Sequence, residues 1–166
     1  KNLISILNCL CKNYLRLWAM TYSKVYENQQ DKKNEEKLAE LLAKKFKCKM
    51  LPEPKFSYFD YVAHRNKRPV AMIEMRKRSH EYSKYPTIMM PLQKLTAYHA
   101  VKGITNLPCY FVVEWKDYVG YADFDDFIIE ADYRISEISH NRRGDLRQEI
   151  VSHLPKEKVK LIYKYE

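Results

Sequence analysis

The chain has 166 residues, 46% of them hydrophobic, which fits one domain with a substantial core and excludes a fibre, a repeat array and a disordered tail. Thirty Lys and Arg against 21 Asp and Glu give a formal net charge of +9, spread along the chain rather than gathered in one tail. This charge favours a polyanionic partner, nucleic acid first and an anionic membrane surface second, although a basic soluble protein without such a partner has the same composition.

Residues 1–20 (KNLISILNCLCKNYLRLWAM) differ from the rest of the chain. They are rich in Leu and Ile, but polar side chains interrupt them too often for a membrane span. A signal peptide requires a cleavage site of small residues after its apolar part, and this segment has none. We expect residues 1–20 to be an N-terminal appendage, either helical or not native, and residues 21–166 to form a single domain with no membrane partner.

The four cysteines are Cys9, Cys11, Cys48 and Cys109. They form no C-x-x-C pair and have no histidines at zinc spacing, so neither a zinc finger nor a disulfide framework is indicated. A reducing, cytoplasmic location fits this usage best. Cys109 lies in an apolar strand pattern and is expected to be a core thiol.

The first clear element is a helix over residues 31–46, in which Leu38, Leu42 and Phe46 fall on one stripe. Glu35 lies within the same stripe, whereas Glu36 points away from it. A carboxylate on the buried side of a helix needs a partner, so Glu35 is a candidate metal ligand. The alternative is a glutamate near the helix start that the macrodipole favours.

Two alternating stretches follow, FSYFDY (56–61) and VAMIEMRKR (70–78). Glu74 and Arg76 share one face of the second stretch, because side chains alternate along a strand. If the stretches pair as a hairpin through residues 63–69, Asp60 lies beside Glu74. Two carboxylates brought together in this way can hold Mg²⁺ or Mn²⁺ and so activate water against a phosphodiester. The alternative is a turn aspartate and a cross-strand Glu74–Arg76 ion pair.

A second helix is predicted over residues 90–102, begun by Pro91 and ended by Gly103. A basic, tyrosine-rich loop over residues 80–86 precedes it. Further strands are predicted over residues 47–51, 108–115, 118–124 and 159–165. This order of helix, acid-bearing strands, helix and strands indicates an α/β or α+β domain.

Asp60, Glu74-x-Arg76 at the end of an apolar strand, and Gln93-Lys94 opening a helix before the strand CYFVVEW together resemble the PD-(D/E)XK nuclease superfamily. The resemblance is to its small phage and resolvase-like members and covers residues 31–124. It implies an α/β restriction-endonuclease-like core with a mixed central sheet flanked by helices. It also implies metal-dependent hydrolysis of DNA phosphodiester bonds, a possible homodimer and, for a phage protein, the host cytoplasm.

The resemblance assigns roles to individual residues. Asp60 and Glu74 correspond to the two metal-binding acids, Glu35 or else Glu36 to the acid of the first helix, and Gln93 to a glutamine near the scissile phosphate. Tyr98 lies five residues after Gln93, where a related pattern has tyrosine at four, so its role stays open.

The chain departs from the family pattern at Arg76, where these nucleases usually have lysine. Arginine stays charged and suits a phosphate clamp rather than a base. Lys94 is a possible substitute because a helix can project its ammonium into the same pocket, whereas Lys77 lies on the opposite strand face. The missing lysine leaves open a second reading, a catalytically inactive DNA-binding protein with a nuclease-like fold.

Basic side chains around these motifs are expected to contact DNA phosphates with strong salt dependence. Tyr82 and Tyr85 either stack on exposed bases or pack within the protein. The basic candidates are Arg65, Lys67, Arg68, Lys77, Arg78, Lys84, Arg142 and Arg143, with Lys55 and His64 beside the hairpin turn.

Overall fold

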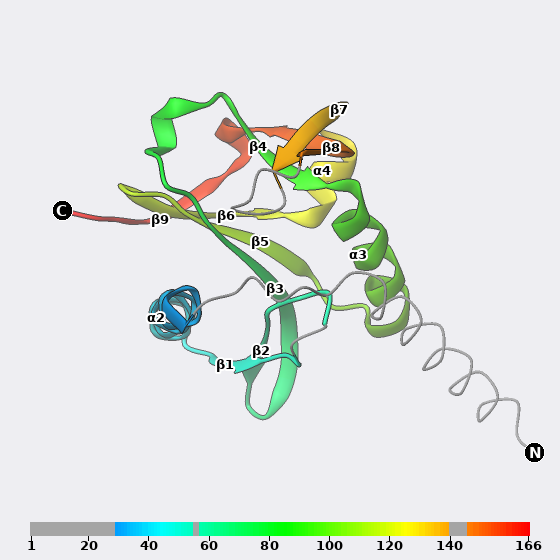
Figure 1. Cartoon of the computed structure of the whole chain (residues 1–166). Helices are drawn as coiled ribbons and strands as arrows, with labels where there is room; N and C mark the ends of the chain where they lie inside the picture. The colour runs from blue at the N-terminus through cyan, green and yellow to red at the C-terminus, as the bar shows by residue number, and fades with distance from the viewer. Residues whose placement is uncertain (1–28, 55–56, 140–145) are drawn as a thin grey trace, which may run out of the picture.

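The computed structural model describes residues 29–54, 57–139 and 146–166. A mixed sheet forms the centre of the molecule and helices flank it, which confirms the predicted fold class (Figure 1). The helices are α2 (Gln29–Phe46), α3 (Leu92–Thr105) and α4 (Phe124–Ile129), with the 3₁₀ turns η1 (Tyr82–Lys84) and η2 (Lys156–Lys158). The strands are β1 (Lys49–Pro52), β2 (Tyr61–Arg65), β3 (Arg68–Lys77), β4 (Thr87–Pro91), β5 (Cys109–Glu114), β6 (Tyr118–Asp123), β7 (Asp132–Ser139), β8 (Leu146–Pro155) and β9 (Lys160–Lys164).

The main sheet has the strand order β1-β2-β3-β5-β6-β9. Strands β3 and β5 run parallel, and the connection between them passes through β4 and α3, whereas the other neighbours are antiparallel. Strands β4, β8 and β7 form a second, antiparallel sheet. The parallel pair places the start of α3 close to the end of β3.

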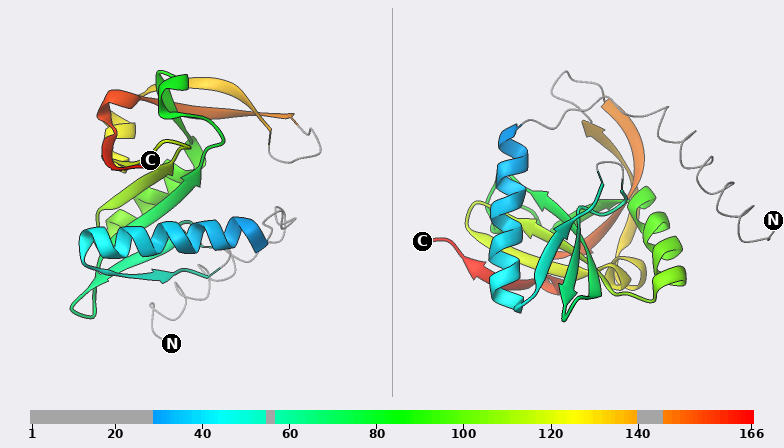
Figure 2. Two further views of the ribbon diagram at one scale, coloured as in Figure 1. Left: turned by 90° about the vertical axis from the view of Figure 1, so that its left-hand side faces the viewer. Right: turned by 90° about the horizontal axis from the view of Figure 1, so that it is seen from below.

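The main sheet buries both of its faces. On one face α2 packs Leu38 and Leu42 against Ile73 and Met75 of β3. On the other face lies a core built from α3, α4 and the smaller sheet, and Met72 of β3 packs against it. Viewed from below, α2 and α3 lie on opposite sides of the strands (Figure 2). Because side chains alternate along β3, Glu74 faces the α3 side.

The hairpin formed by β2 and β3 is present, but its bounds differ from the prediction. Residues 57–60 bend, and β2 begins only at Tyr61. The turn contracts to Asn66 and Lys67, whose φ angles of 52° and 63° are those of a two-residue hairpin turn with both central residues left-handed. Because the turn is this tight, β2 continues to Arg65 and β3 begins at Arg68, so both strands run into the predicted 63–69 connection.

Helix α3 also differs at its end, because it continues through Gly103 to Thr105. Asn106 adopts a left-handed φ of 54° and donates its backbone N–H to the carbonyl of Lys102, which ends the helix. Cys109 is fully buried, as predicted, while Cys9 and Cys11 lie outside the described residues, as does the predicted appendage over residues 1–20. No helix in the described ranges is both long and apolar enough to span a membrane.

Candidate active site

Asp60 lies immediately before β2, opposite the end of β3. Its backbone N–H donates to the carbonyl of Ile73 at 3.0 Å, and its Oδ2 accepts the backbone N–H of Met75 at 2.6 Å. The carboxylate thus takes the place of a backbone carbonyl where the ladder between β2 and β3 ends. These two bonds fix the Asp60 side chain beside the residue that precedes Met75, which is Glu74.

Glu74 is the one charged residue that is buried among those described, with 7% of its surface exposed. Burial raises the pKa of its carboxyl to about 7; the nearby Lys94 ammonium opposes this rise, and the charge of Asp60 adds to it. The hydrogen bond from the Met75 backbone to Asp60 Oδ2 makes the two carboxylates neighbours. They therefore form a pair of acids that repel each other in a partly desolvated site.

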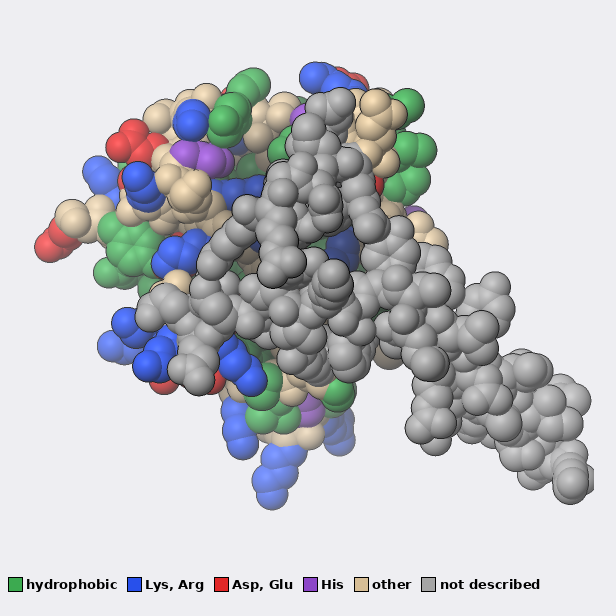
Figure 3. All heavy atoms as spheres, viewed as in Figure 1, with side chains coloured by type: hydrophobic (Ala, Val, Ile, Leu, Met, Phe, Trp, Pro, Cys, Tyr) green, Lys and Arg blue, Asp and Glu red, His purple; other side chains and the backbone are tan. Residues whose placement is uncertain are grey.

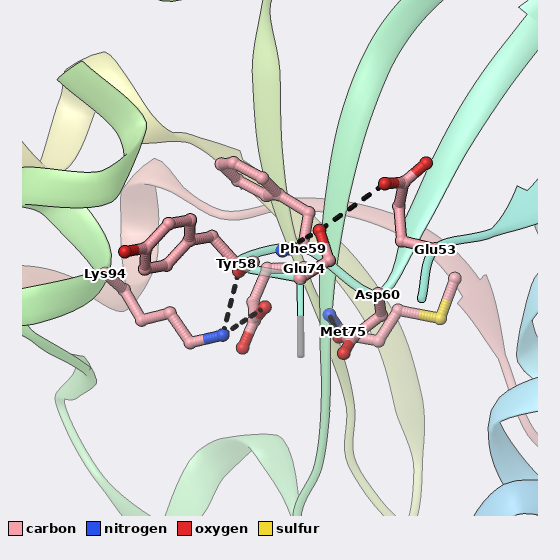
Figure 4. A network of polar contacts seen from close by, with 8 residues as sticks. Glu53, Tyr58, Phe59, Asp60, Glu74, Met75 and Lys94 are labelled. Atoms are coloured by element: carbon pink, nitrogen blue, oxygen red, sulfur yellow. Dashed lines mark hydrogen bonds and ion pairs between the residues drawn. The ribbon is translucent and has the colours of Figure 1, made fainter. Parts of the chain in front are cut away.

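Lys94 is the third residue of α3, and its side chain spans from the helix to the acid pair. Its Nζ donates to Oε2 of Glu74 at 2.8 Å and to the backbone carbonyl of Tyr58 at 2.9 Å (Figure 4). Lys94 is partly buried, with 32% of its side chain exposed. A lysine ammonium is therefore presented to Glu74 from the neighbouring helix, whereas position 76 of the strand holds arginine.

Arg76 and Gln93 are both exposed near this centre. Arg76 lies two residues after Glu74, and its charge lowers the pKa of that carboxyl, although less than the nearby Lys94 does. Gln93 precedes Lys94 in the first turn of α3, where backbone N–H groups lack partners within the helix and attract anions. The acid pair is thus bordered by positive charge on two sides.

Glu35 is brought near Asp60 but not into one cluster with Glu74. It lines a hollow of about 760 Å³ between α2 and the segment leading to β2, together with Glu36 and Asp60. It also borders a second hollow of about 370 Å³ with Arg76 and Lys77. Within the described ranges, no three His, Cys, Asp or Glu side chains are arranged as a metal-binding cluster. The predicted set of Glu35, Asp60 and Glu74 is consequently represented here by the Asp60–Glu74 pair.

Several predicted DNA-binding residues make contacts within the protein. Lys77 forms an ion pair with Glu114 of β5 at 3.0 Å, as their positions opposite each other in the parallel pair allow. Arg78 is partly buried, and both burial and the charge of Arg76 lower the pKa of its guanidinium. Lys84 is exposed and lies over the ring of Tyr85 at 5.2 Å.

The three basic residues of the hairpin lie far from the acids. Arg65, Lys67 and Arg68 are exposed around the turn, at the opposite end of β2 from Asp60. Six residues of strand separate Asp60 from Asn66, which is about 20 Å at a rise of about 3.3 Å per residue. These cations therefore lie away from the acids, at the hairpin turn, and their contact with DNA stays a prediction. Arg142, Arg143 and Lys55 lie outside the described residues.

Two features of the site were not predicted. The carbonyl of Tyr58 is a partner of Lys94, and a backbone acceptor of this kind leaves no side-chain signal. Tyr98, whose role the sequence left open, is fully buried and donates its hydroxyl to Asp125 at 2.6 Å, next to the Lys102–Asp125 ion pair. Tyr98 therefore anchors α3 to α4 rather than facing Glu74.

Comparison with known proteins identifies a family model that matches most of the chain. The family model described as "Phage putative PDDEXK endonuclease" matches residues 21–160. No curated protein matches the chain. Among solved structures, Archaeoglobus fulgidus Hjc, a Holliday junction resolvase from an archaeal hyperthermophile, is similar at a TM-score of 0.42 and 10% identity, over 68% of this chain and 76% of that chain.

Proposed function

Because the chain belongs to the phage PDDEXK endonuclease family, we propose that it is a metal-dependent endonuclease that hydrolyses DNA phosphodiester bonds. The family membership confirms the resemblance drawn from Asp60, Glu74 and the start of the second helix. The observation that carries the proposal is the 2.8 Å contact between Lys94 Nζ and Glu74 Oε2. It supports Lys94 as the replacement for the lysine that the family usually has two residues after the acid.

The donor set of the site suits a divalent cation of the Mg²⁺ or Mn²⁺ type. Asp60 and Glu74 offer carboxylate oxygens, the ligands that such hard cations prefer. Burial is the main reason that the pKa of Glu74 is raised, and the charge of Asp60 adds to it, so a cation held by both acids would offset both effects. Glu35 stands on the Asp60 side of the site as a further acid. When bound, the ion lowers the pKa of a coordinated water so that hydroxide is available near neutral pH.

Lys94 acts from a fixed position in this proposal. Its bonds to Glu74 and to the Tyr58 carbonyl use two of the three ammonium protons. The third is available to the attacking water or to a phosphate oxygen, so the ammonium can stabilise charge that develops during attack. The first bond also keeps Glu74 oriented toward the reaction centre.

The phosphate is held by the groups that border the acids. Arg76 can bind two phosphate oxygens with its planar guanidinium. The N-terminal turn of α3 adds backbone N–H donors and the positive end of the helix dipole, and Gln93 adds a side-chain amide from the same turn. Attack of water on phosphorus then breaks the bond to the leaving oxygen while these groups compensate the added negative charge.

Plasmid nicking tests the proposal directly. The purified chain should convert supercoiled plasmid to open circles with Mg²⁺ or Mn²⁺, and EDTA should stop the conversion. Glu74→Gln and Asp60→Asn should abolish nicking while circular dichroism shows an unchanged fold. Arg76 in place of the usual lysine favours one alternative, an inactive DNA-binding protein, and that reading predicts salt-sensitive DNA binding without nicking in any divalent metal.

A further inference from the structure

Seven exposed cations gather where α2 ends and the β2–β3 hairpin turns. Figure 3 shows blue side chains at the lower end of the molecule, where this hairpin projects in the view of Figure 1. We call this surface the basic patch. Its members are Lys44, Lys45, Lys47, Lys49, Arg65, Lys67 and Arg68, all of them exposed.

The basic patch accounts for most of the charge imbalance of the chain. It takes seven of the 30 Lys and Arg, which leaves 23 to set against 21 Asp and Glu in the rest of the sequence. Residues 41–52 and 61–73, which carry the patch, contain no Asp or Glu at all. In the part of the chain that the structure describes, no carboxylate forms an ion pair with any of the seven. The positive field here is consequently not neutralised from within.

The patch is also concave. A hollow of about 580 Å³ lies between the end of α2 and the hairpin, and five of the seven cations line it. They are Lys44, Lys47, Lys49, Arg65 and Lys67. A hollow lined by cations fits the ridge of a phosphate backbone, whereas the flat face of a bilayer meets a concave surface only at its rim.

Stabilisation of the helix end explains only part of the patch. Lys44 and Lys45 lie in the last turn of α2, where cations interact favourably with the macrodipole, and Arg65 donates to the Phe46 carbonyl at 2.9 Å. The remaining four cations lie outside the last turn of α2. Two of them, Lys47 and Lys67, have left-handed φ angles of 50° and 63°.

Those two backbone positions favour other residues. Lysine in the left-handed region costs about 1 kcal/mol relative to glycine, which is the usual residue after a helix and at the second position of such a hairpin turn. Lys47 and Lys67 thus place ammonium groups in the hollow against the local backbone preference. A ligand for those ammonium groups is the physical reason that fits.

We infer that the basic patch is a second DNA-binding surface, which binds the backbone of duplex DNA at a distance from the reaction centre. The inference takes the nature of the ligand from the proposed function. The hairpin turn lies about 20 Å from Asp60, which corresponds to about six base-pair steps of duplex. The patch therefore contributes affinity without touching the scissile phosphate, and it acts on substrate binding rather than on the chemical step.

The test replaces Lys47 and Lys67, the two lysines in left-handed backbone positions, with glycine, which adopts that conformation more readily. Lys47→Gly and Lys67→Gly together delete two charges from the hollow and relieve two strained positions, so folding should be preserved. The matched control is Lys33→Ala with Lys37→Ala, which deletes two exposed lysines of α2 outside the patch. Binding to a fluorescent 30-base-pair duplex is followed by anisotropy in EDTA over a range of salt, so that cleavage plays no part.

If the patch binds DNA, the Gly variant lowers the slope of log K against log salt by about 0.9 per lost phosphate contact. For two contacts its affinity falls on the order of 50-fold at 0.1 M salt, while the control stays near the wild type. With Mg²⁺, its KM for cleavage rises and kcat at saturating DNA is unchanged.

An unchanged salt slope in the Gly variant, or an equal loss in the control, overturns the inference. So does a loss of binding to phosphatidylserine vesicles without a loss of binding to duplex. The two proposals fail separately. If the wild type never cleaves DNA but the Gly variant binds DNA poorly, the nuclease proposal is refuted and the DNA-binding role of the patch is upheld. If the wild type cleaves DNA and the Gly variant binds DNA normally, the nuclease proposal stands and the role of the patch is refuted.

Discussion

Lys94→Met distinguishes a catalytic lysine from an incidental ion pair. Methionine keeps most of the lysine stem but removes the ammonium that lies 2.8 Å from Glu74 Oε2 and 2.9 Å from the Tyr58 carbonyl. If that ammonium stabilises charge in the transition state, its loss should lower kcat by about 10²–10³-fold, or about 2.7–4 kcal/mol in the barrier. The KM for DNA should change far less, because the phosphate-binding Arg76 remains.

The same substitution should have a stability signature that depends on pH. A hydrogen bond between charged groups contributes about 1.5–3 kcal/mol, so the free energy of unfolding should fall by up to this amount at pH 8. At pH 5.5 the loss should be smaller, because the pKa of Glu74 is raised to about 7 and the protonated carboxyl needs no cation. Urea unfolding in EDTA at the two pH values measures the difference.

Plasmid nicking at saturating DNA measures the kinetic effect, and a second substitution provides the rescue. Arg76→Lys in the Lys94→Met background returns lysine to its usual place in the family, and we expect it to restore at least about one order of magnitude in kcat, since one positioned group contributes about 10²–10³. A folded Lys94→Met variant whose kcat stays within about threefold of the wild type would refute the reasoning.

Three further predictions concern the acids and the sheet. In EDTA the folded protein holds a proton on Glu74 that the unfolded chain releases, so wild-type stability should fall by up to about 3 kcal/mol as pH rises from 4.5 to about 7, and Glu74→Gln should flatten this dependence in urea titrations. Asp60→Asn keeps an oxygen for the Met75 N–H but removes the charge that repels Glu74, so Mg²⁺-dependent nicking should drop about 10³-fold without a loss of Tm. Gly120→Ala would place its Cβ 2.7 Å from Val159 Cγ1, so calorimetry should show a loss of about 1–3 kcal/mol while nicking per folded molecule persists.

The elements with long periodic patterns could be predicted from the sequence. Helix α2 and strands β3, β5 and β6 bury most of their apolar side chains, whereas β9, also predicted, has only Ile162 partly buried. The shared face of Glu74 and Arg76 follows from the same alternation. The helical stripe also predicted that Glu35 turns toward the interior, but a stripe does not tell which part of the sheet the carboxylate reaches. Glu35 lines the same hollow as Asp60, and Glu74 is not among the residues that line it.

The elements without a local pattern were missed. Strand β4 has only five residues and pairs with β8, which lies more than fifty residues later in the chain. Such a pairing depends on tertiary contacts rather than on local preference. Strands β7 and β8 leave Ile135 and Ile150 exposed, so their alternation does not separate a buried face from a solvated one. Helix α4 has six residues and is begun by the side chain of Asp123, a signal too short to predict a helix.

Supplying the cation from α3 makes the site depend on how that helix packs. A lysine two residues after Glu74 would be positioned by β3 itself, whereas Lys94 is positioned only as well as α3 is held against the sheet. Leu95, the next residue, is 2% exposed, and it packs with Tyr98 in the core on that face. Leu95→Ala should therefore cost about 2–5 kcal/mol of stability and also lower the kcat of the molecules that remain folded. If kcat per folded molecule is unchanged while stability falls, Lys94 does not take its position from this packing.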